Sequence, residues 1–231
     1  MIISHKHKFI FLKTSKTAGT SIEIALSKFC GKDDIITPIS KEDERLRTNL
    51  GYRGPQNYQF SCSDYNLMDY MNYIFKFRKR RKKEFYNHIN SKEIKKTIHN
   101  SCWDNYYKFC FERNPWDKVV SQYYWKTADP RPSIEDFLKS RHIIGLKKRG
   151  FNIYTINKIL SVDKVYKFEE LNESLSHIKK MLNFPEDIIL PKAKTKYRTD
   201  KKHYSKMFNE QEKKIIENQF KEEIKLFNYH Y

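Results

Sequence analysis

The sequence lacks several features that would place it in a common class of protein. Its 231 residues include only six Gly and four Cys, and no two Cys form a Cys-x-x-Cys pair. Without such a pair a zinc site is not expected, and the scattered cysteines favour free thiols over disulfides. No apolar stretch approaches the ~20 residues of a membrane span, and residues 1–8 lack the apolar region of a signal peptide. These absences predict a cytoplasmic protein with neither a metal nor a membrane span.

The composition is that of a folded, strongly basic chain. Hydrophobic residues make up 39% and charged residues 32% of the sequence, which is typical of a globular protein rather than a disordered one. The formal net charge is +18. A charge of this sign favours anionic partners, which include nucleotides, nucleic acids, acidic glycans and membrane surfaces. The charge alone does not choose among them.

The hydrophobic pattern alternates between short apolar runs and amphipathic segments. Strands are predicted at 9–12, 85–89, 106–111 and 163–168, and helices at 20–30, from 114, at 171–182 and at 210–227. This order predicts an α/β fold with a central, mainly parallel sheet flanked by helices. The length is that of a single domain over 1–231, in which 32–84 is a variable insertion with few signals beyond a helix start at Ser40.

A polar segment, Lys13-Thr-Ser-Lys-Thr-Ala-Gly-Thr-Ser21, joins the first predicted strand to the first helix. A helix N-terminus presents unpaired N–H donors and the positive end of a dipole, so it binds phosphate. Gly19 allows a close approach of the anion, Lys16 adds a charge, and hydroxyls come from Thr17, Thr20 and Ser21. The segment is not a Walker A loop, because its Lys precedes its Gly.

A second segment, Phe111-Glu-Arg-Asn-Pro-Trp-Asp-Lys-Val-Val-Ser121, also passes from a strand to a helix. Asn114 and Pro115 are typical of positions Ncap and N1 of a helix. Arg113 ends the strand, and the carboxyl ends of parallel strands line one crevice. We therefore expect Arg113 to point into the same crevice as the first loop, where its forked guanidinium suits a phosphate. Ser121 lies two helical turns further on and could add a hydroxyl.

Together these segments resemble the sulfotransferase family. Lys16-Thr17-Ala18-Gly19-Thr20-Ser21 is similar to its 5′-phosphosulfate-binding loop, and Arg113 with Ser121 is similar to its 3′-phosphate-binding pair. The resemblance is greatest to the carbohydrate sulfotransferases, including the heparan sulfate 2-O-sulfotransferase branch, whose strand before Phe-Glu-x-Leu resembles 163–171. One departure is Ser15, where the family usually has Pro. The resemblance implies a three-layer, Rossmann-like (P-loop-like) fold and the donor 3′-phosphoadenosine 5′-phosphosulfate (PAPS).

The resemblance also implies roles for individual residues. Tyr86-Asn-His-Ile89 resembles the strand that carries the catalytic base, so His88 is our choice for the group that takes the acceptor proton. Glu112, Asp117 and His99 are alternatives, although Glu112 is expected on the opposite side of its strand from Arg113. Lys16 would stabilise the developing charge.

Two basic segments remain open. In the loop 191–198, Lys194, Thr195 and Arg198 are candidates to close over the nucleotide, as a basic loop does in family members. The run Lys76–Lys83 is either a solvated surface or a binding patch that would favour an acidic acceptor. The acceptor is expected to be a hydroxyl of a carbohydrate, and the oligomeric state is not readable.

Two other functions compete with this interpretation. One is a P-loop-type nucleotide kinase or NTPase, which the order of residues around Lys16 disfavours. The other is a basic nucleic-acid-binding module, which the net charge of +18 allows. Because the sequence has no helix-turn-helix, zinc-finger or ribonucleoprotein motif, we do not expect nucleic acid as a partner.

Overall fold

The computed structural model describes residues 1–75, 82–191 and 202–231. Its centre is a five-stranded sheet with the order β3-β1-β2-β4-β7. The strands are β1 (Ile2–Ser4), β2 (Phe9–Phe11), β3 (Ile35–Ile36), β4 (Tyr107–Glu112) and β7 (Lys164–Lys167). β1 is antiparallel to β2 and β3, whereas β2, β4 and β7 pair in parallel. β1 alone therefore runs against the other four, and the prediction of a mainly parallel sheet is confirmed.

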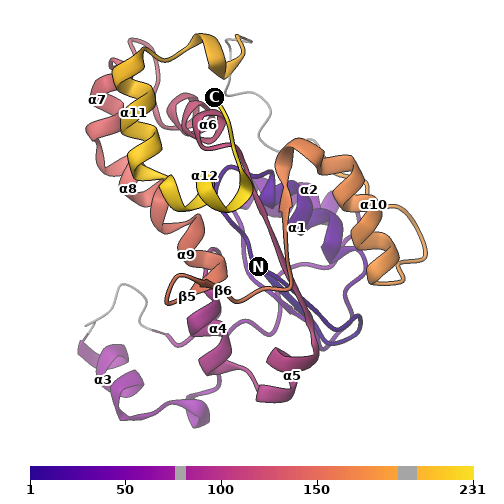
Figure 1. Cartoon of the computed structure of the whole chain (residues 1–231). Coiled ribbons are helices and arrows are strands. Elements are labelled where there is room, and N and C mark those ends of the chain that lie inside the picture. Colours follow the sequence, from indigo (N-terminus) through magenta and orange to yellow (C-terminus); the bar gives the residue numbers. More distant parts are fainter. Residues whose placement is uncertain (76–81, 192–201) are drawn as a thin grey trace.

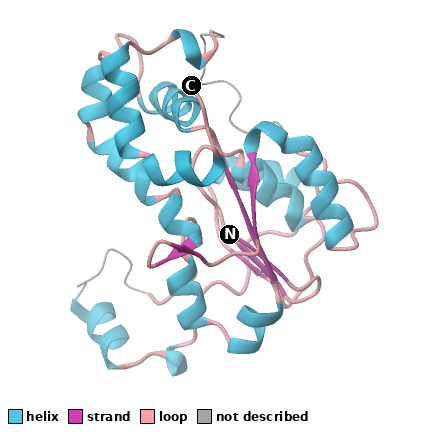
Figure 2. Cartoon of the chain, in the orientation of Figure 1, coloured by secondary structure: helices cyan, strands magenta, loops and turns pink. Residues whose placement is uncertain are grey.

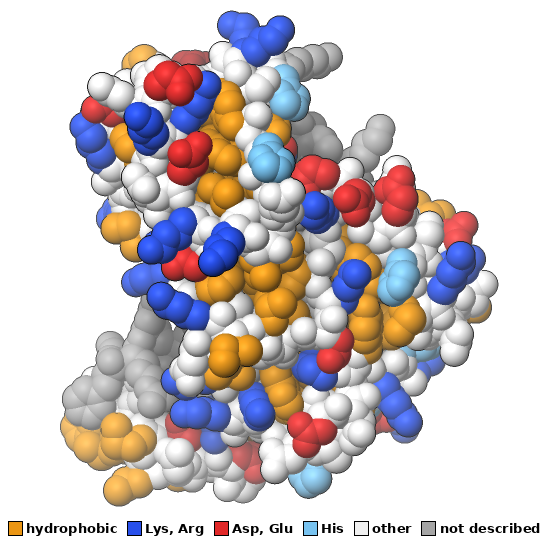
Figure 3. Space-filling model, viewed as in Figure 1, with side chains coloured by type: hydrophobic (Ala, Val, Ile, Leu, Met, Phe, Trp, Pro, Cys, Tyr) orange, Lys and Arg blue, Asp and Glu red, His pale blue; other side chains and the backbone are white. Residues whose placement is uncertain are grey.

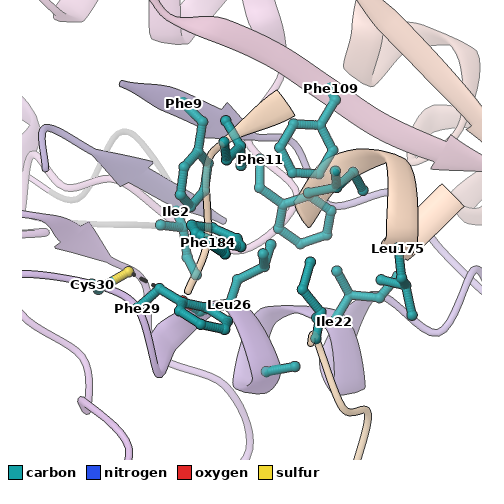
Figure 4. Close-up of a cluster of buried hydrophobic side chains, with 14 of the residues drawn as sticks. Ile2, Phe9, Phe11, Ile22, Leu26, Phe29, Cys30, Phe109, Leu175 and Phe184 are labelled. Carbon is teal, nitrogen blue, oxygen red and sulfur yellow. Dashed lines mark hydrogen bonds between the residues drawn. The ribbon is translucent and has the colours of Figure 1, made fainter. Parts of the chain in front are cut away.

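Helices cover both faces of this sheet (Figures 1 and 2). Side chains alternate along β2, so that Phe9 and Phe11 face α1 (Gly19–Ser27) and α10 (Leu171–Met181), while Ile10 faces the opposite layer. On the first face the Phe9, Phe11 and Phe109 rings meet aliphatic side chains from both helices (Figure 4). The opposite layer contains α4 (Ser91–Thr97), α5 (Asn100–Asn105) and α9 (Phe151–Tyr154).

A third hydrophobic cluster lies apart from the sheet and consists mainly of helical side chains. It joins α6 (Pro115–Lys126), α7 (Ile134–Lys139) and α8 (Arg141–Lys148) to α11 (Glu210–Gln219) and α12 (Lys221–Phe227). The prediction of one helix over 210–227 is wrong, because the helix breaks at Phe220 (φ −118°, ψ 26°). The break keeps Phe220 inside the helical cluster and turns α12 so that the Phe227 ring reaches Tyr154 beside the sheet.

The predicted insertion 32–84 contributes one edge of the sheet and several peripheral elements. It contains β3, α2 (Lys41–Asn49), the 3-10 turn η1 (Cys62–Asp64) and α3 (Leu67–Phe75). Ser40 caps α2, as predicted, by accepting a bond from the Asp43 N–H. α3 leaves Leu67, Met68 and Ile74 at least 60% exposed, and hydrophobic side chains are visible at the lower left of Figure 3, where Figure 1 places α3.

The prediction of a strand over 85–89 is wrong. Only the first part of this segment is extended: Glu84 forms an isolated bridge with Gln59, and the Phe85 N–H donates to the Tyr58 carbonyl. The chain then turns, with the Ile89 N–H bonded to the Tyr86 carbonyl and His88 in the left-handed region at φ 63°. A left-handed residue cannot continue a strand.

The remaining elements are short connections. They are the hairpin of β5 (Thr155–Ile156) and β6 (Ile159–Leu160), and the 3-10 turns η2 (Phe168–Glu170) and η3 (Tyr204–Lys206). No helix in the described ranges is long and apolar enough to cross a membrane. That the chain forms a single domain remains a prediction.

A buried carboxylate organises the layer beneath α1. Glu23 has no solvent exposure and contacts the Lys13 ammonium at 2.8 Å, the Met1 amino group at 2.8 Å and the Arg47 guanidinium at 3.8 Å. Burial alone would raise the pKa of Glu23, but these cations outweigh it and lower that pKa to about 2. The ionised form of Glu23 is therefore the one that the fold requires.

We expect Glu23→Gln to reduce the free energy of unfolding by about 3–5 kcal/mol, because it leaves buried cations without their carboxylate. Glu186→Gln is the matched control, since Glu186 pairs with Lys28 at 2.6 Å while 52% exposed, and we expect it to cost about 0–1 kcal/mol. Urea denaturation measures both. An equal, small loss in the two variants would contradict this role for Glu23.

Candidate functional site

A pocket opens where β2 and β4 end, as expected for the carboxyl ends of parallel strands. Its volume is about 240 Å³, below the ~300–1,000 Å³ of pockets that enclose a whole drug-sized ligand, so it would enclose only part of such a ligand. The lining residues are Lys13, Thr14, Ser15, Lys16, Ala18, Gly19, Thr20, Ser21, Asn87, His88, Arg113, Ser121, Trp125 and Phe168. The structure thus brings both sequence motifs and His88 to one cavity.

The loop before α1 presents backbone donors to this pocket. Lys16 (φ 67°) and Ala18 (φ 56°) are both in the left-handed region, a conformation that turns successive N–H groups into a concave anion-binding nest. The first hydrogen bond of α1 runs from the Ile22 N–H to the Ala18 carbonyl at 3.1 Å, and Ala18 supplies no side-chain cap. The N–H groups of Gly19, Thr20 and Ser21 therefore face the cavity without a cap from that position.

Thr17 is the one residue of the predicted loop that does not line the pocket. Its side chain is 1% exposed, and its hydroxyl lies 2.9 Å from the Thr14 hydroxyl, which in turn donates to the Phe111 carbonyl. Thr17, which was predicted to offer its hydroxyl to a phosphate, is thus part of the connection between the loop and β4. Ser15, the departure from the family pattern, donates its N–H to the Arg149 carbonyl at 2.8 Å.

The structure explains the glycine at position 19 differently from the sequence, which predicted a close approach of an anion. A Cβ atom at this position would lie 2.8 Å from Lys13 Cγ and 3.3 Å from the Thr14 carbonyl oxygen. The absence of a side chain allows the buried Lys13 stem to pass beneath the first turn of α1 and to reach Glu23. The loop therefore keeps its shape because Gly19 packs against Lys13.

Arg113 lies beside the loop, as the strand position predicted. Its Nη1 donates to the Lys16 carbonyl at 3.0 Å, and its Nε and Nη2 donate to Asp117 at 2.9 and 2.7 Å. The guanidinium carbon lies 4.3 Å from the centroid of the Phe168 ring. Three of the five N–H donors of an arginine are thus used, and two remain to meet an anion in the pocket.

Ser121 and Trp125 share one face of α6. They are four residues apart on this helix, so both reach the pocket. The Lys16 ammonium lies 4.8 Å from the Trp125 ring centroid, within the range of a cation–π contact. Sequence analysis missed Trp125 although the i, i+4 spacing from Ser121 was a readable signal, and it missed Phe168, which follows β7 at the same edge of the sheet.

His88 is held at the wall of the pocket in a defined tautomer. Its Nδ1 lies 2.7 Å from the Lys13 carbonyl oxygen; because a carbonyl only accepts, Nδ1 carries the proton and Nε2 carries the lone pair. Burial, followed by the charge of Lys13, lowers the pKa of His88 to about 3 against a hydrogen bond that raises it. The imidazole is therefore neutral throughout the physiological range.

The alternative bases occupy structural positions. Glu112 is fully buried, 2.6 Å from the Lys118 ammonium and 2.9 Å from the Tyr154 hydroxyl, on the side of β4 away from the pocket, as expected. Asp117 binds Arg113. His99 is exposed and caps α5 by accepting the Ser101 N–H. His88 alone among these four lines the cavity.

Two sets of predicted residues lie outside the described residues. Lys194, Thr195 and Arg198 fall in 192–201, and most of the basic run Lys76–Lys83 falls in 76–81. In the part of the chain that the structure describes, no group of three or more His, Cys, Asp or Glu side chains is arranged to hold a metal. All four cysteines are free thiols, which agrees with the prediction from their spacing.

We expect Gly19→Ala to weaken binding of adenosine 3′,5′-bisphosphate at least about tenfold and to destabilise the fold by about 1–3 kcal/mol, because its Cβ overlaps Lys13. Gly54→Ala is the control, since a Cβ there meets nothing within 4 Å. Calorimetric titration and urea denaturation measure the two effects. Unchanged affinity in Gly19→Ala would show that the shape of this loop does not govern nucleotide binding.

The pKa of His88 also predicts how stability depends on pH. Because the folded-state pKa of about 3 lies below the unfolded value of 6.5, the unfolded chain binds a proton first as the pH falls, and stability is lost from pH 6.5 down to pH 3. His88→Asn, which tolerates the left-handed backbone, should abolish about 2 kcal/mol of the loss between pH 7.5 and pH 5. Urea denaturation at both pH values measures this loss, and His99→Asn, which should lose as much stability as the wild type, is the control. If His88→Asn also lost as much stability as the wild type, the prediction would be wrong.

Comparisons with known proteins give a relative but no named family. No protein-family model matches the chain. A crystal structure of a sulfotransferase from Alicyclobacillus acidocaldarius aligns over 96% of this chain and 96% of its own, at 13% identity and a TM-score of 0.42, which is too low to establish a shared fold. An uncharacterised protein of Archaeoglobus fulgidus is 36% identical over 101 residues, which are 41% of this chain and 82% of the archaeal protein. The chain therefore belongs to the same family as that archaeal protein.

Proposed function

We propose that the chain is a sulfotransferase that passes a sulfuryl group from PAPS to a hydroxyl of a carbohydrate. The observation that carries the proposal is the composition of one pocket. An uncapped helix N-terminus with Lys16 at its loop, the guanidinium of Arg113 and the neutral imidazole of His88 all line it. An anion site at one end and a positioned base at its wall are what transfer of an anionic group to a hydroxyl needs.

The donor has two anionic ends that match two groups of residues. The N–H groups of Gly19, Thr20 and Ser21, with Lys16, would bind the 5′-phosphosulfate. Arg113, through its two remaining N–H donors, and Ser121 would bind the 3′-phosphate. Because Arg113 also donates to the Lys16 carbonyl, the two subsites are held at a fixed separation. Trp125 and Phe168 line the same cavity, and their rings would contact the nucleoside.

The transfer is a substitution at sulfur. The acceptor oxygen forms a bond to sulfur while the bond between sulfur and the bridging phosphate oxygen breaks, and the electron pair leaves on adenosine 3′,5′-bisphosphate. His88 Nε2 takes the acceptor proton, with Nδ1–H fixed on the Lys13 carbonyl. Lys16 and the N–H groups of the first turn of α1 stabilise the charge that grows on the departing phosphate.

The pKa of His88 is low for a general base, and it would suit that role only after the bound donor has raised it. Burial, Lys13 and then Arg149 disfavour the imidazolium and lower the pKa of His88 to about 3. Negative charge placed beside a histidine favours its protonated form and raises its pKa. Binding of the donor would therefore strengthen the base at the moment when a proton must be accepted.

A kinase or NTPase and a nucleic-acid-binding module remain the competing functions, and one titration separates them. We expect adenosine 3′,5′-bisphosphate to bind in EDTA as tightly as in Mg²⁺, and added DNA or RNA to leave that affinity unchanged. Binding of ATP only with Mg²⁺ would favour the first alternative. Nucleic-acid binding that the nucleotide does not displace would favour the second.

The catalytic test uses His88→Asn, which keeps a donor for the Lys13 carbonyl but has no basic nitrogen. We expect kcat for sulfuryl transfer from labelled PAPS to fall by about 10²–10⁴-fold, as for loss of a general base, while the Kd of adenosine 3′,5′-bisphosphate changes little. His99→Asn, at the exposed cap of α5, is the control and should retain full activity. Retained activity in His88→Asn would remove His88 from the mechanism and leave the donor site standing.

A further inference from the structure

A second cleft adjoins the donor pocket. It is lined by Tyr86, Asn87, His88, Asn90, Lys148, Arg149, Asn152 and Ile153 and has a volume of about 620 Å³. Asn87 and His88 line both cavities, so the two spaces meet at the imidazole. A group bound in the second cleft would therefore lie beside His88, next to the donor pocket.

The lining of this second cleft is polar and basic. Three Asn side chains and one Tyr hydroxyl provide amide and hydroxyl groups of the kind that bind sugar hydroxyls. The Asn87 Oδ1 atom is buried and has no hydrogen-bond partner among the described residues. Lys148 and Arg149 line the cleft, whereas no Asp or Glu of the described residues does. Glu93 accepts hydrogen bonds from the Tyr86 hydroxyl and the Asn90 amide.

Arg149 is fixed in place without a counter-charge. Its carbonyl accepts the Ser15 N–H at 2.8 Å and its Nε donates to the Gly145 carbonyl at 3.2 Å. The side chain is half-buried, and no carboxylate of the described residues lies within 4 Å of it or of the exposed Lys148 ammonium. A guanidinium that is partly removed from water usually has an anionic partner. The cleft therefore contains the Arg149 guanidinium but no carboxylate of the described residues to pair with it.

A simpler explanation for basic residues here is the helix dipole. Lys147, Lys148 and Arg149 stand at the C-terminal end of α8, where cations are favoured. That effect applies equally to Lys147, which is exposed and does not line the cleft. A variant of Lys147 therefore serves as a control, because it removes a charge from the same helix end without removing a residue that lines the cleft.

We infer that this second cleft is the acceptor site and that it selects a carbohydrate bearing an anionic substituent, a carboxylate or a sulfate, near the hydroxyl that is modified. The inference rests on the proposed function. Lys148 and Arg149 bind the anion, the Asn side chains bind neighbouring hydroxyls, and the reacting hydroxyl points to His88 Nε2. The anion thereby orients the sugar, so that its hydroxyl lies between the imidazole and the donor sulfur.

The experiment measures acceptor binding to the complex of the full chain with adenosine 3′,5′-bisphosphate, which needs no turnover. The probes are an oligoglucuronate, the same oligosaccharide after reduction of its carboxylates, and a partly sulfated form of the reduced product. We expect either anionic probe to bind at least about tenfold more tightly than the neutral one, as for one charged hydrogen bond. Lys148→Ala and Arg149→Gln should remove that preference, and Lys147→Ala should keep it.

The outcomes separate this inference from the proposed function. If adenosine 3′,5′-bisphosphate does not bind at all, the proposed function fails. If it binds but the neutral probe binds as well as both anionic ones, the inference is wrong and the proposed function stands. Equal weakening by Lys147→Ala and Lys148→Ala would likewise overturn it, because the effect would then be general charge rather than a site. Urea denaturation of each variant in parallel excludes loss of folding as the cause.

Discussion

The candidate site depends on the way in which the loop before α1 is fastened to the end of β4. The Thr14 hydroxyl donates to the Phe111 carbonyl in β4, and the Lys16 carbonyl accepts from Arg113, which directly follows that strand. These contacts join segments almost a hundred residues apart in the chain. They hold the helix N-terminus and the arginine at one edge of the sheet, and every other feature of the pocket is arranged around that edge.

Buried charges keep this edge rigid from below. Lys13 reaches Glu23 under α1, and Lys118 reaches Glu112 at the end of β4, both pairs with almost no solvent exposure. Glu112 also accepts the N–H of Arg113. Such pairs contribute little net stability over apolar residues, but each fixes one orientation of the groups that it joins. Here those groups include the backbone positions from which the proposed anion-binding donors project.

The sequence was most informative where one local pattern decides the structure. The β2–loop–α1 unit, the Asn114–Pro115 start of α6 and β4 were all predictable, because apolar periodicity and capping residues act over short distances. β1 and β3 are only three and two residues long, and runs of that length leave too weak a pattern to predict.

The predictions of secondary structure were wrong where tertiary contacts outweighed the local conformational preference of the residues. Residues 85–89 read as β-prone, but His88 adopts a left-handed turn stabilised by the distant Lys13 carbonyl. The helix break at Phe220 follows from the need to bury that ring among α6–α8. In the site, the pairing of Thr17 with Thr14 and the reach of Trp125 into the pocket depend on how separate elements pack.

Arg149 connects the two cavities, because it lines the second cleft and bonds to Ser15, which lines the first pocket. Its carbonyl accepts the Ser15 N–H in the loop before α1, while the residue lines the second cleft, which His88 also lines. If the two cavities bind a sugar and a nucleotide as proposed, a shift of Arg149 toward the sugar would be transmitted through one hydrogen bond to the loop before α1. Occupancy of the two halves would then be thermodynamically linked, each altering the affinity of the other by the same factor.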